Sequence, residues 1–189
     1  MKRFIAAILC VGLIAAVTAG CGYKDALSKE NKATQATEAT GSSATADEPK
    51  PADFKDNLEG LISYFAELEY LAMKDGKLDE STVTVMDASL IGAKEGKKFI
   101  TAYGGKAITI ELYEYDLKNL NDTAKTVVES VKNSGEFTIL DLPSVKAYLS
   151  DDEKYLLIYT DSSIDDEKPD ENSDNYKHRE EVIENFRKF

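Results

Sequence analysis

Residues 99–115, FITAYGGKAITIELYEY, hold two β-prone runs on either side of Gly104-Gly105. Both central residues of a type I′ turn need positive φ, which glycine adopts without strain, so the pattern predicts a β-hairpin. A two-residue turn also fixes the register of the two strands, and it sets Phe99 opposite Ile110. The segment therefore predicts an antiparallel sheet.

The second run of this hairpin alternates between apolar and polar side chains. We expect the aliphatic side chains of Ile108, Ile110 and Leu112 to face the core. Tyr113 and Tyr115 are then expected to point outward.

Two other regions are strand-like. Residues 82–86 alternate ahead of the hairpin, and the runs 145–149 and 155–160 flank an acidic turn at 150–153. The latter two runs predict a second hairpin.

Three segments carry apolar residues at steps of three and four, the spacing of an amphipathic helix. The first begins at Asp53, its expected N-cap, and ends before Gly76. The second begins after Asn121, its expected N-cap, and stops at Gly135. The apolar positions are Phe54, Leu58, Leu61, Ile62, Phe65, Leu68, Leu71 and Ala72, then Ala124, Val127, Val128 and Val131, then Val182, Ile183, Phe186 and Phe189.

The expected order is helix, strands, helix, strands, helix. Strands joined by hairpins form an antiparallel sheet, and amphipathic helices need a sheet face to cover their apolar stripes. The sequence therefore predicts an α+β fold, an antiparallel β-sheet of hairpins with three amphipathic helices packed on one face.

The amino terminus has the three parts of a secretory signal peptide. Lys2 and Arg3 precede an apolar stretch at 4–17, and small residues follow it. The apolar stretch is shorter than the ~20 residues that a membrane-spanning helix needs. We expect residues 1–20 to be a signal peptide that is removed on export.

The residues Thr18-Ala19-Gly20-Cys21 resemble the lipobox of bacterial prolipoproteins, with Thr18 in a place where Leu is usual. The resemblance implies that the thiol of Cys21 receives a diacylglyceryl group and that the mature chain begins there. Two acyl chains are enough for stable anchoring. The expected location is the extracytoplasmic face of the cell membrane.

Behind Cys21 the chain is rich in small and polar residues up to residue 52. Such a composition cannot bury enough apolar surface to offset the entropy of ordering. We expect residues 21–52 to be the lipid-attached terminus with a disordered tether, and residues 53–189 to be a single α+β domain.

The chain has 35 acidic and 23 basic residues and a formal net charge of −12. An acidic surface repels phosphate backbones, so nucleic acid is not an expected partner, and the membrane is contacted through the lipid anchor. The two cysteines are Cys10 in the leader and Cys21, which leaves no thiol for a disulfide, a zinc site or a nucleophile.

His178 is the only histidine, and we expect it in a solvated turn of the last helix. Without a second histidine or a cysteine it has no partners for a triad or a metal site, so no catalytic residue, metal or cofactor is predicted. The acidic loop 161–174 invites a calcium interpretation but lacks the spacing of an EF-hand. A mobile acidic loop is favoured, and calcium binding stays open.

Two interpretations of function follow. The leading one is a non-catalytic domain that binds a protein, peptide or wall component through tyrosines on the outward face of the sheet. The alternative is a small hydrolase of envelope or extracellular substrates that uses two carboxyl groups. The tyrosines are Tyr113, Tyr115, Tyr148, Tyr155 and Tyr159, and the available acids are Asp87, Glu111, Glu114, Asp116, Asp141 and Asp161.

Three strings, DASLIGAKEG at 87–96, IELYEYD at 110–116 and KAYL at 146–149, resemble a group of small lipoproteins of Gram-positive anaerobic bacteria. The resemblance covers residues 53–189. The group has no assigned biochemical function, so the resemblance implies a lipoprotein and carries over no site residue.

Overall fold

A computed structural model describes residues 48–140 and 142–189. The expected signal peptide, Cys21, most of the expected tether and Asp141 lie outside the described residues. These described residues belong to one compact unit. Within the described part of the chain, no helix combines the length and the apolar character that crossing a membrane requires.

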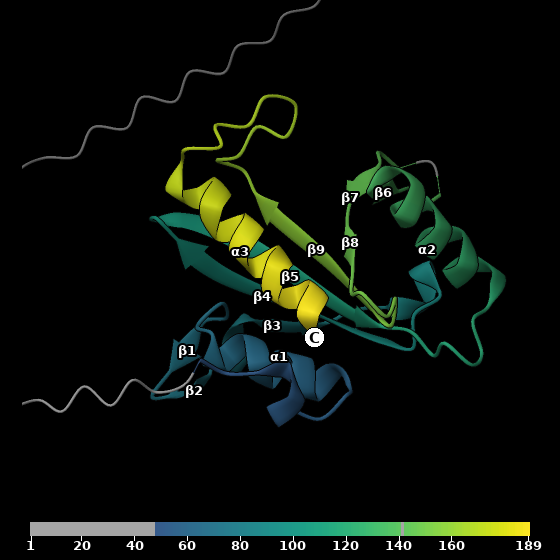
Figure 1. Ribbon diagram of the computed structural model, residues 1–189, viewed down its shortest axis with the longest axis horizontal. Helices are drawn as coiled ribbons and strands as arrows, with labels where there is room; N and C mark the ends of the chain where they lie inside the picture. Colours follow the sequence, from purple (N-terminus) through teal and green to yellow (C-terminus); the bar gives the residue numbers. More distant parts are fainter. Residues whose placement is uncertain (1–47, 141) are drawn as a thin grey trace, which may run out of the picture. The chain divides into compact units, whose positions relative to one another are not determined.

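The centre of this unit is a five-stranded antiparallel sheet (Figure 1). Two small two-stranded sheets lie outside it. In spatial order the central strands are β3 (Val83–Val85), β4 (Glu95–Tyr103), β5 (Lys106–Glu114), β9 (Tyr155–Asp161) and β8 (Tyr148–Leu149), and the small sheets are β1 (Met73–Lys74) with β2 (Lys77–Leu78) and β6 (Glu136–Phe137) with β7 (Val145–Lys146).

The hairpin of β4 and β5 is confirmed with its register. Gly104 and Gly105 have φ values of 56° and 74°, as a type I′ turn requires, and Phe99 lies opposite Ile110. The second hairpin is confirmed for β8 and β9, where Tyr148 lies opposite Leu157. The preceding strand β7 differs, because it pairs with β6.

The helices are α1 (Leu58–Glu67), α2 (Asp122–Ser134) and α3 (Asp174–Lys188). Asn121 caps α2 as predicted, since its side chain accepts a hydrogen bond of 2.8 Å from the Ala124 N–H. Gly135 ends this helix with a φ of 74°.

The predicted bounds of α1 are wrong at both ends, since the helix stops at Glu67 and the strand β1 precedes Gly76. Asp53 closes a short 3₁₀ turn, η1 (Pro51–Asp53), and its carboxylate accepts from the backbone N–H of Lys50. Asn57 caps α1, because its side-chain oxygen accepts a hydrogen bond of 2.8 Å from the Gly60 N–H.

One face of the sheet packs against α1 and α3 (Figure 1). The aliphatic residues of β5 face this core, as the alternation predicts. Its fully buried members include Leu61, Phe65, Phe99, Ile108, Ile110, Leu112, Leu157, Val182 and Phe186.

The opposite face is covered as well. Tyr113 and Leu156 alternate with residues of the first core and pack with Val127 and Val131 of α2 in a second core. The α+β class, the antiparallel sheet and the three helices are confirmed. The structure differs in the place of α2, which packs on the second face because that face is also apolar.

Candidate functional site: a charged cleft at the end of the sheet

The five tyrosines predicted as a binding surface do not form one exposed patch. Tyr113 and Tyr115 are buried in the core with α2, so the expectation that they point outward is wrong. Tyr155 and Tyr159 are buried in the core with α1 and α3, and Tyr148 is half-buried beside it. The cause is that β5 and β9 are buried on both faces.

His178 is not in a solvated turn. Its ring stacks on Tyr103 at 3.8 Å between centroids and meets the edges of Tyr70 and Tyr159. Burial among these rings lowers the pKa of His178, although the charges of nearby carboxylates oppose the shift.

Several carboxylates of the loop 161–174 are engaged within the protein. Asp161 accepts from Ser163 and Asn175, and Asp166 pairs with the buried Arg179 at 2.6 Å. Among the described residues, no group of three or more His, Cys, Asp or Glu side chains is placed to hold a metal ion.

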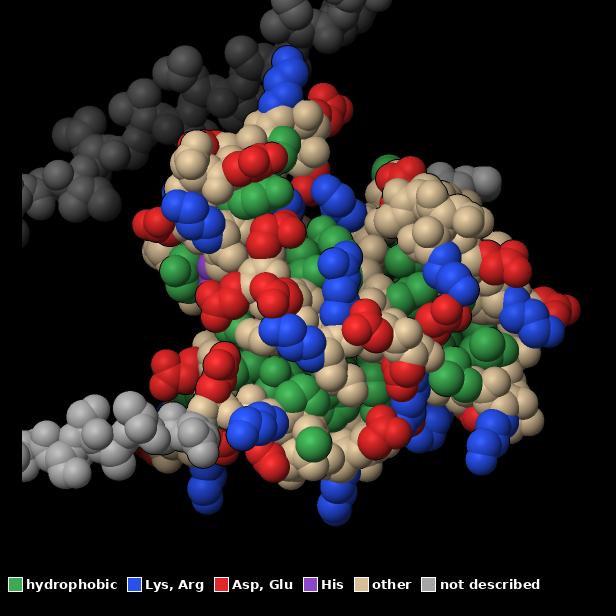
Figure 2. All heavy atoms as spheres, in the orientation of Figure 1, with side chains coloured by type: hydrophobic (Ala, Val, Ile, Leu, Met, Phe, Trp, Pro, Cys, Tyr) green, Lys and Arg blue, Asp and Glu red, His purple; other side chains and the backbone are tan. Residues whose placement is uncertain are grey.

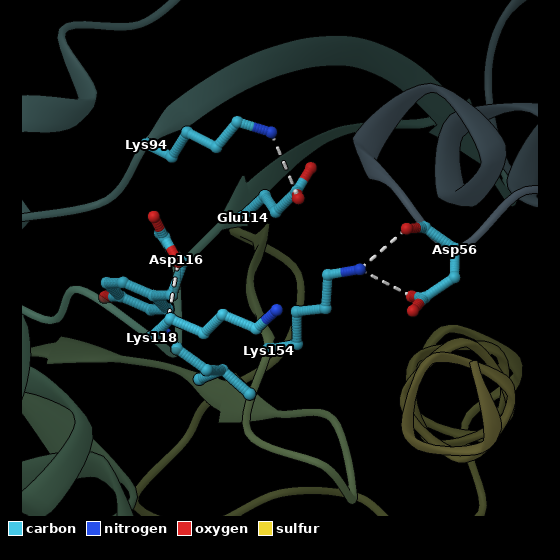
Figure 3. Close-up of a pocket in the computed structure, with 8 residues that line it drawn as sticks. Asp56, Lys94, Glu114, Asp116, Lys118 and Lys154 are labelled. Atoms are coloured by element: carbon cyan, nitrogen blue, oxygen red, sulfur yellow. Dashed lines mark hydrogen bonds and ion pairs between the residues drawn. The ribbon is translucent and has the colours of Figure 1, made fainter.

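A cavity of about 510 Å³ opens where β5 ends (Figure 3). Its volume lies in the range of small-ligand sites. Six charged side chains of both signs line it, together with a tyrosine and one exposed leucine: Asp56, Lys94, Glu114, Tyr115, Asp116, Leu117, Lys118 and Lys154.

The antiparallel register brings these residues together. The end of β5 lies beside the starts of β4 and β9, since Glu114 is opposite both Glu95 and Tyr155. Lys94 immediately precedes β4, and Lys154 immediately precedes β9. The residues directly before two strands and directly after a third therefore meet at one end of the sheet.

Glu114 ties the cleft to α1. Its side chain is 6% exposed, accepts a hydrogen bond of 2.8 Å from the Leu58 N–H, and lies 3.3 Å from the ammonium of Lys94. The first N–H groups of a helix lack intrahelical partners and carry partial positive charge, so a carboxylate is stabilised there.

Asp56 and Lys154 form the second pair. The Lys154 ammonium donates at 2.7 Å to both the carbonyl oxygen and Oδ1 of Asp56, and the Tyr155 hydroxyl donates to the same Oδ1 at 2.8 Å. These hydrogen bonds, the one from Lys154 first, lower the pKa of Asp56.

Asp116 and Lys118 lie in the turn after β5. The Asp116 carboxylate accepts from the side chain of Asn119 at 2.8 Å and from the backbone N–H of Lys118 at 3.1 Å, and these bonds lower its pKa. The ammonium of Lys118 makes no ion pair with any described residue.

Glu114 and Asp116 are among the acids that the sequence identified, whereas Asp56 and the three lysines were missed. Asp87, Glu111 and Asp161 lie elsewhere, since Asp87 accepts from Ser89, Glu111 lies 3.7 Å from Lys98, and Asp161 accepts from Ser163. Asp141 lies outside the described residues. The only signal in the sequence for the lysines is that each lies in a turn beside a strand.

One face of the molecule carries mixed charge. Figure 2 shows acidic and basic side chains interspersed over the face that it presents. A charged partner on that face would therefore be recognised by the individual charged groups that it contacts, and not by a surface of one sign.

Comparison of the chain with family models, curated proteins and solved structures gave no match.

Proposed function

We propose that the protein is an extracytoplasmic lipoprotein, anchored to the cell membrane through Cys21, whose folded domain is a non-catalytic binding module. The leader, the lipobox-like residues and the tether composition support the anchor. The domain binds an extracytoplasmic protein, peptide or wall component in the charged cleft.

The cleft is the observation that carries the binding role. It gathers three ammonium and three carboxylate groups from separate segments into one cavity large enough for a small ligand or a peptide end. Convergent polar groups in a cavity are the usual feature of a site that orients a ligand.

The alternative is a carboxylate-dependent hydrolase, and the buried Glu114 in the same cavity as two other acids favours it. Hydrolysis of a glycosidic bond needs a carboxyl group of raised pKa as the acid. The pKa values of Asp56 and Asp116 are lowered, so both are ionised near neutral pH and have no proton to donate. Both oxygens of the Glu114 carboxylate are engaged within the protein, one by the Leu58 N–H and the other by the Lys94 ammonium. Binding is therefore the favoured role.

The anchor is tested by mass spectrometry of the native chain together with membrane fractionation. We expect an acylated Cys21 at the amino terminus and recovery with membranes, and release of a Cys21→Ser variant from them. An uncleaved leader or an unmodified thiol would contradict the proposal.

The binding role is tested by thermal melting in the presence of peptides solubilised from the native envelope. We expect Tm to rise for the wild-type chain and for Lys125→Glu, a control on α2, and to stay unchanged for Lys118→Glu. If the peptides change the Tm of the two variants by the same amount, the cleft is not the binding site. Envelope hydrolysis that is lost in Glu114→Gln would instead favour the hydrolase.

A further inference from the structure

The charged groups of the cleft differ in how many hydrogen bonds they make within the protein. The carboxylates of Asp56, Glu114 and Asp116 each accept at least two hydrogen bonds from donors within the protein. A cation entering the cavity would have to compete with these donors. The cleft therefore offers little to a positively charged ligand.

The ammonium groups of the cleft still have unused hydrogen-bond donors. A lysine ammonium carries three N–H donors. Lys154 uses two of them on Asp56, and Lys118 pairs with no described carboxylate. In Figure 3 the end of Lys118 points toward the side chain of Lys154, whose own ammonium is directed at Asp56. The hydrogen-bond donors that remain unused in the cavity therefore belong to these two side chains.

We propose that the cleft binds the terminal carboxylate of a peptide, with one carboxylate oxygen on the ammonium of Lys118 and the other on that of Lys154. The proposal rests on the binding role proposed above and names its ligand class. Charge-assisted hydrogen bonds of this kind are among the stronger polar contacts in proteins.

Two groups of the cleft have no ion-pair partner among the described residues, Asp116 and Lys118. The Asp116 carboxylate accepts hydrogen bonds from the Asn119 side chain and the Lys118 N–H, whereas the Lys118 ammonium has no partner among the described residues. One negative charge on the ligand matches this ammonium. A dianion such as inorganic phosphate would bring a second charge without a counterion, at a cost in desolvation.

The neighbouring residue indicates what the carboxylate is attached to. Leu117 precedes Lys118, lines the same cavity and is 44% exposed. An exposed leucine beside an anion site favours an apolar group on the ligand, because that contact removes apolar surface from water. A peptide that ends in an aliphatic residue has both the carboxylate and the apolar group.

The test is an NMR titration of the isotope-labelled full chain in detergent with three probes. N-acetyl-alanyl-leucine has the free carboxylate, its carboxamide lacks the charge, and dimethyl phosphate is a phosphodiester monoanion. We expect the acid to shift the amide signals of Leu117, Lys118 and Lys154, and the carboxamide to bind about tenfold more weakly.

Variants locate the contact. Lys118→Met should weaken binding of the acid about tenfold, since it removes one charge-assisted hydrogen bond. Lys125→Met makes the same change in charge on α2 and should leave affinity unaltered. Lys118 is exposed and unpaired among the described residues, so its substitution should not change Tm.

Three results would overturn the inference: equal affinity for the acid and the carboxamide, unchanged affinity in Lys118→Met, or a preference for dimethyl phosphate. If the carboxamide binds as well as the acid and shifts the same signals, only the ligand class is wrong and the cleft remains the site. If no probe shifts any signal of the cleft, the proposed binding role is also lost.

Discussion

The carboxylate of Glu114 accepts a hydrogen bond of 2.8 Å from the backbone N–H of Leu58, so the end of β5 and the start of α1 meet at the wall of the cleft. The two residues are far apart in the sequence, and this bond is buried. It fixes the first turn of a core helix to a central strand.

We expect Glu114→Ala to lower the free energy of unfolding by about 2–3 kcal/mol, because the Leu58 N–H is left buried without an acceptor. Glu114→Gln keeps an acceptor oxygen and should cost about 1 kcal/mol. Glu95→Gln removes the exposed partner of the same Lys94 and should stay within about 0.5 kcal/mol. Urea unfolding measures all three, and an equal effect at Glu95 and Glu114 would contradict the structural role.

Gly96 leaves room for an aromatic ring. The ring of Tyr113 lies over it across the β4–β5 pair, where a Cβ would overlap the ring. Gly96→Ala should therefore cost about 1–3 kcal/mol of unfolding free energy. In a Tyr113→Ala background the same substitution should cost close to nothing, and a cost that persists there would show that the overlap is not the cause.

His178 should make stability depend on pH below about 6.5. Its pKa is lowered by burial, so the unfolded chain binds the proton first and stability falls as pH drops below about 6.5. Above that pH the histidine is neutral in both states and contributes no slope. His178→Phe, which retains a ring against Tyr103, should have a flat profile in this range. An unchanged slope in the variant would assign the dependence to other groups.

Asp166 holds the loop 161–174 to α3. Its carboxylate lies 2.6 Å from the guanidinium of Arg179, whose side chain is 6% exposed. Asp166→Ala leaves this charge buried without its closest partner and should cost about 1–3 kcal/mol, below the value for a fully buried pair because Asp166 is half exposed. Glu180→Ala, at the exposed partner of Arg179, is the control and should change the free energy of unfolding by less than about 0.5 kcal/mol.

Calcium should not stabilise the chain. Asp161, Asp165 and Asp170 each accept a hydrogen bond from a backbone N–H group of the loop itself, so one oxygen of each carboxylate is already engaged. Thermal melts with millimolar calcium and with a chelator should coincide. A rise of several degrees in calcium would mean that the loop rearranges into a cation site.

Local patterns predicted much of this fold. Gly104-Gly105 predicted the first hairpin because glycine adopts the positive φ that a type I′ turn needs at both positions, and Asn121 and Gly135 marked both ends of α2. The start of α1 was missed because Asp53 and Asn57 are both good caps, and tertiary contacts decide between them.

The second core was missed for a different reason. The alternation in β5 indicated one buried face, yet Tyr113 is large enough to pack and does so. The signal was in β9, where 155–159 are apolar without interruption, as in a strand buried on both faces.

The cleft depends on which strand ends meet, and this information is not local. Glu114 and Asp116 stood out as acids near a strand end, but nothing in the sequence connects them to Lys154 or Asp56. Strand order and register supply that connection.

The uninterrupted apolar run of β9 also determines how the molecule responds to force and heat. Its neighbouring side chains belong alternately to the two cores, so neither helical layer can separate from the sheet without loosening a strand that the other layer shares. The domain should come apart in a single cooperative step, and the geometry at the end of β5 should persist until that step.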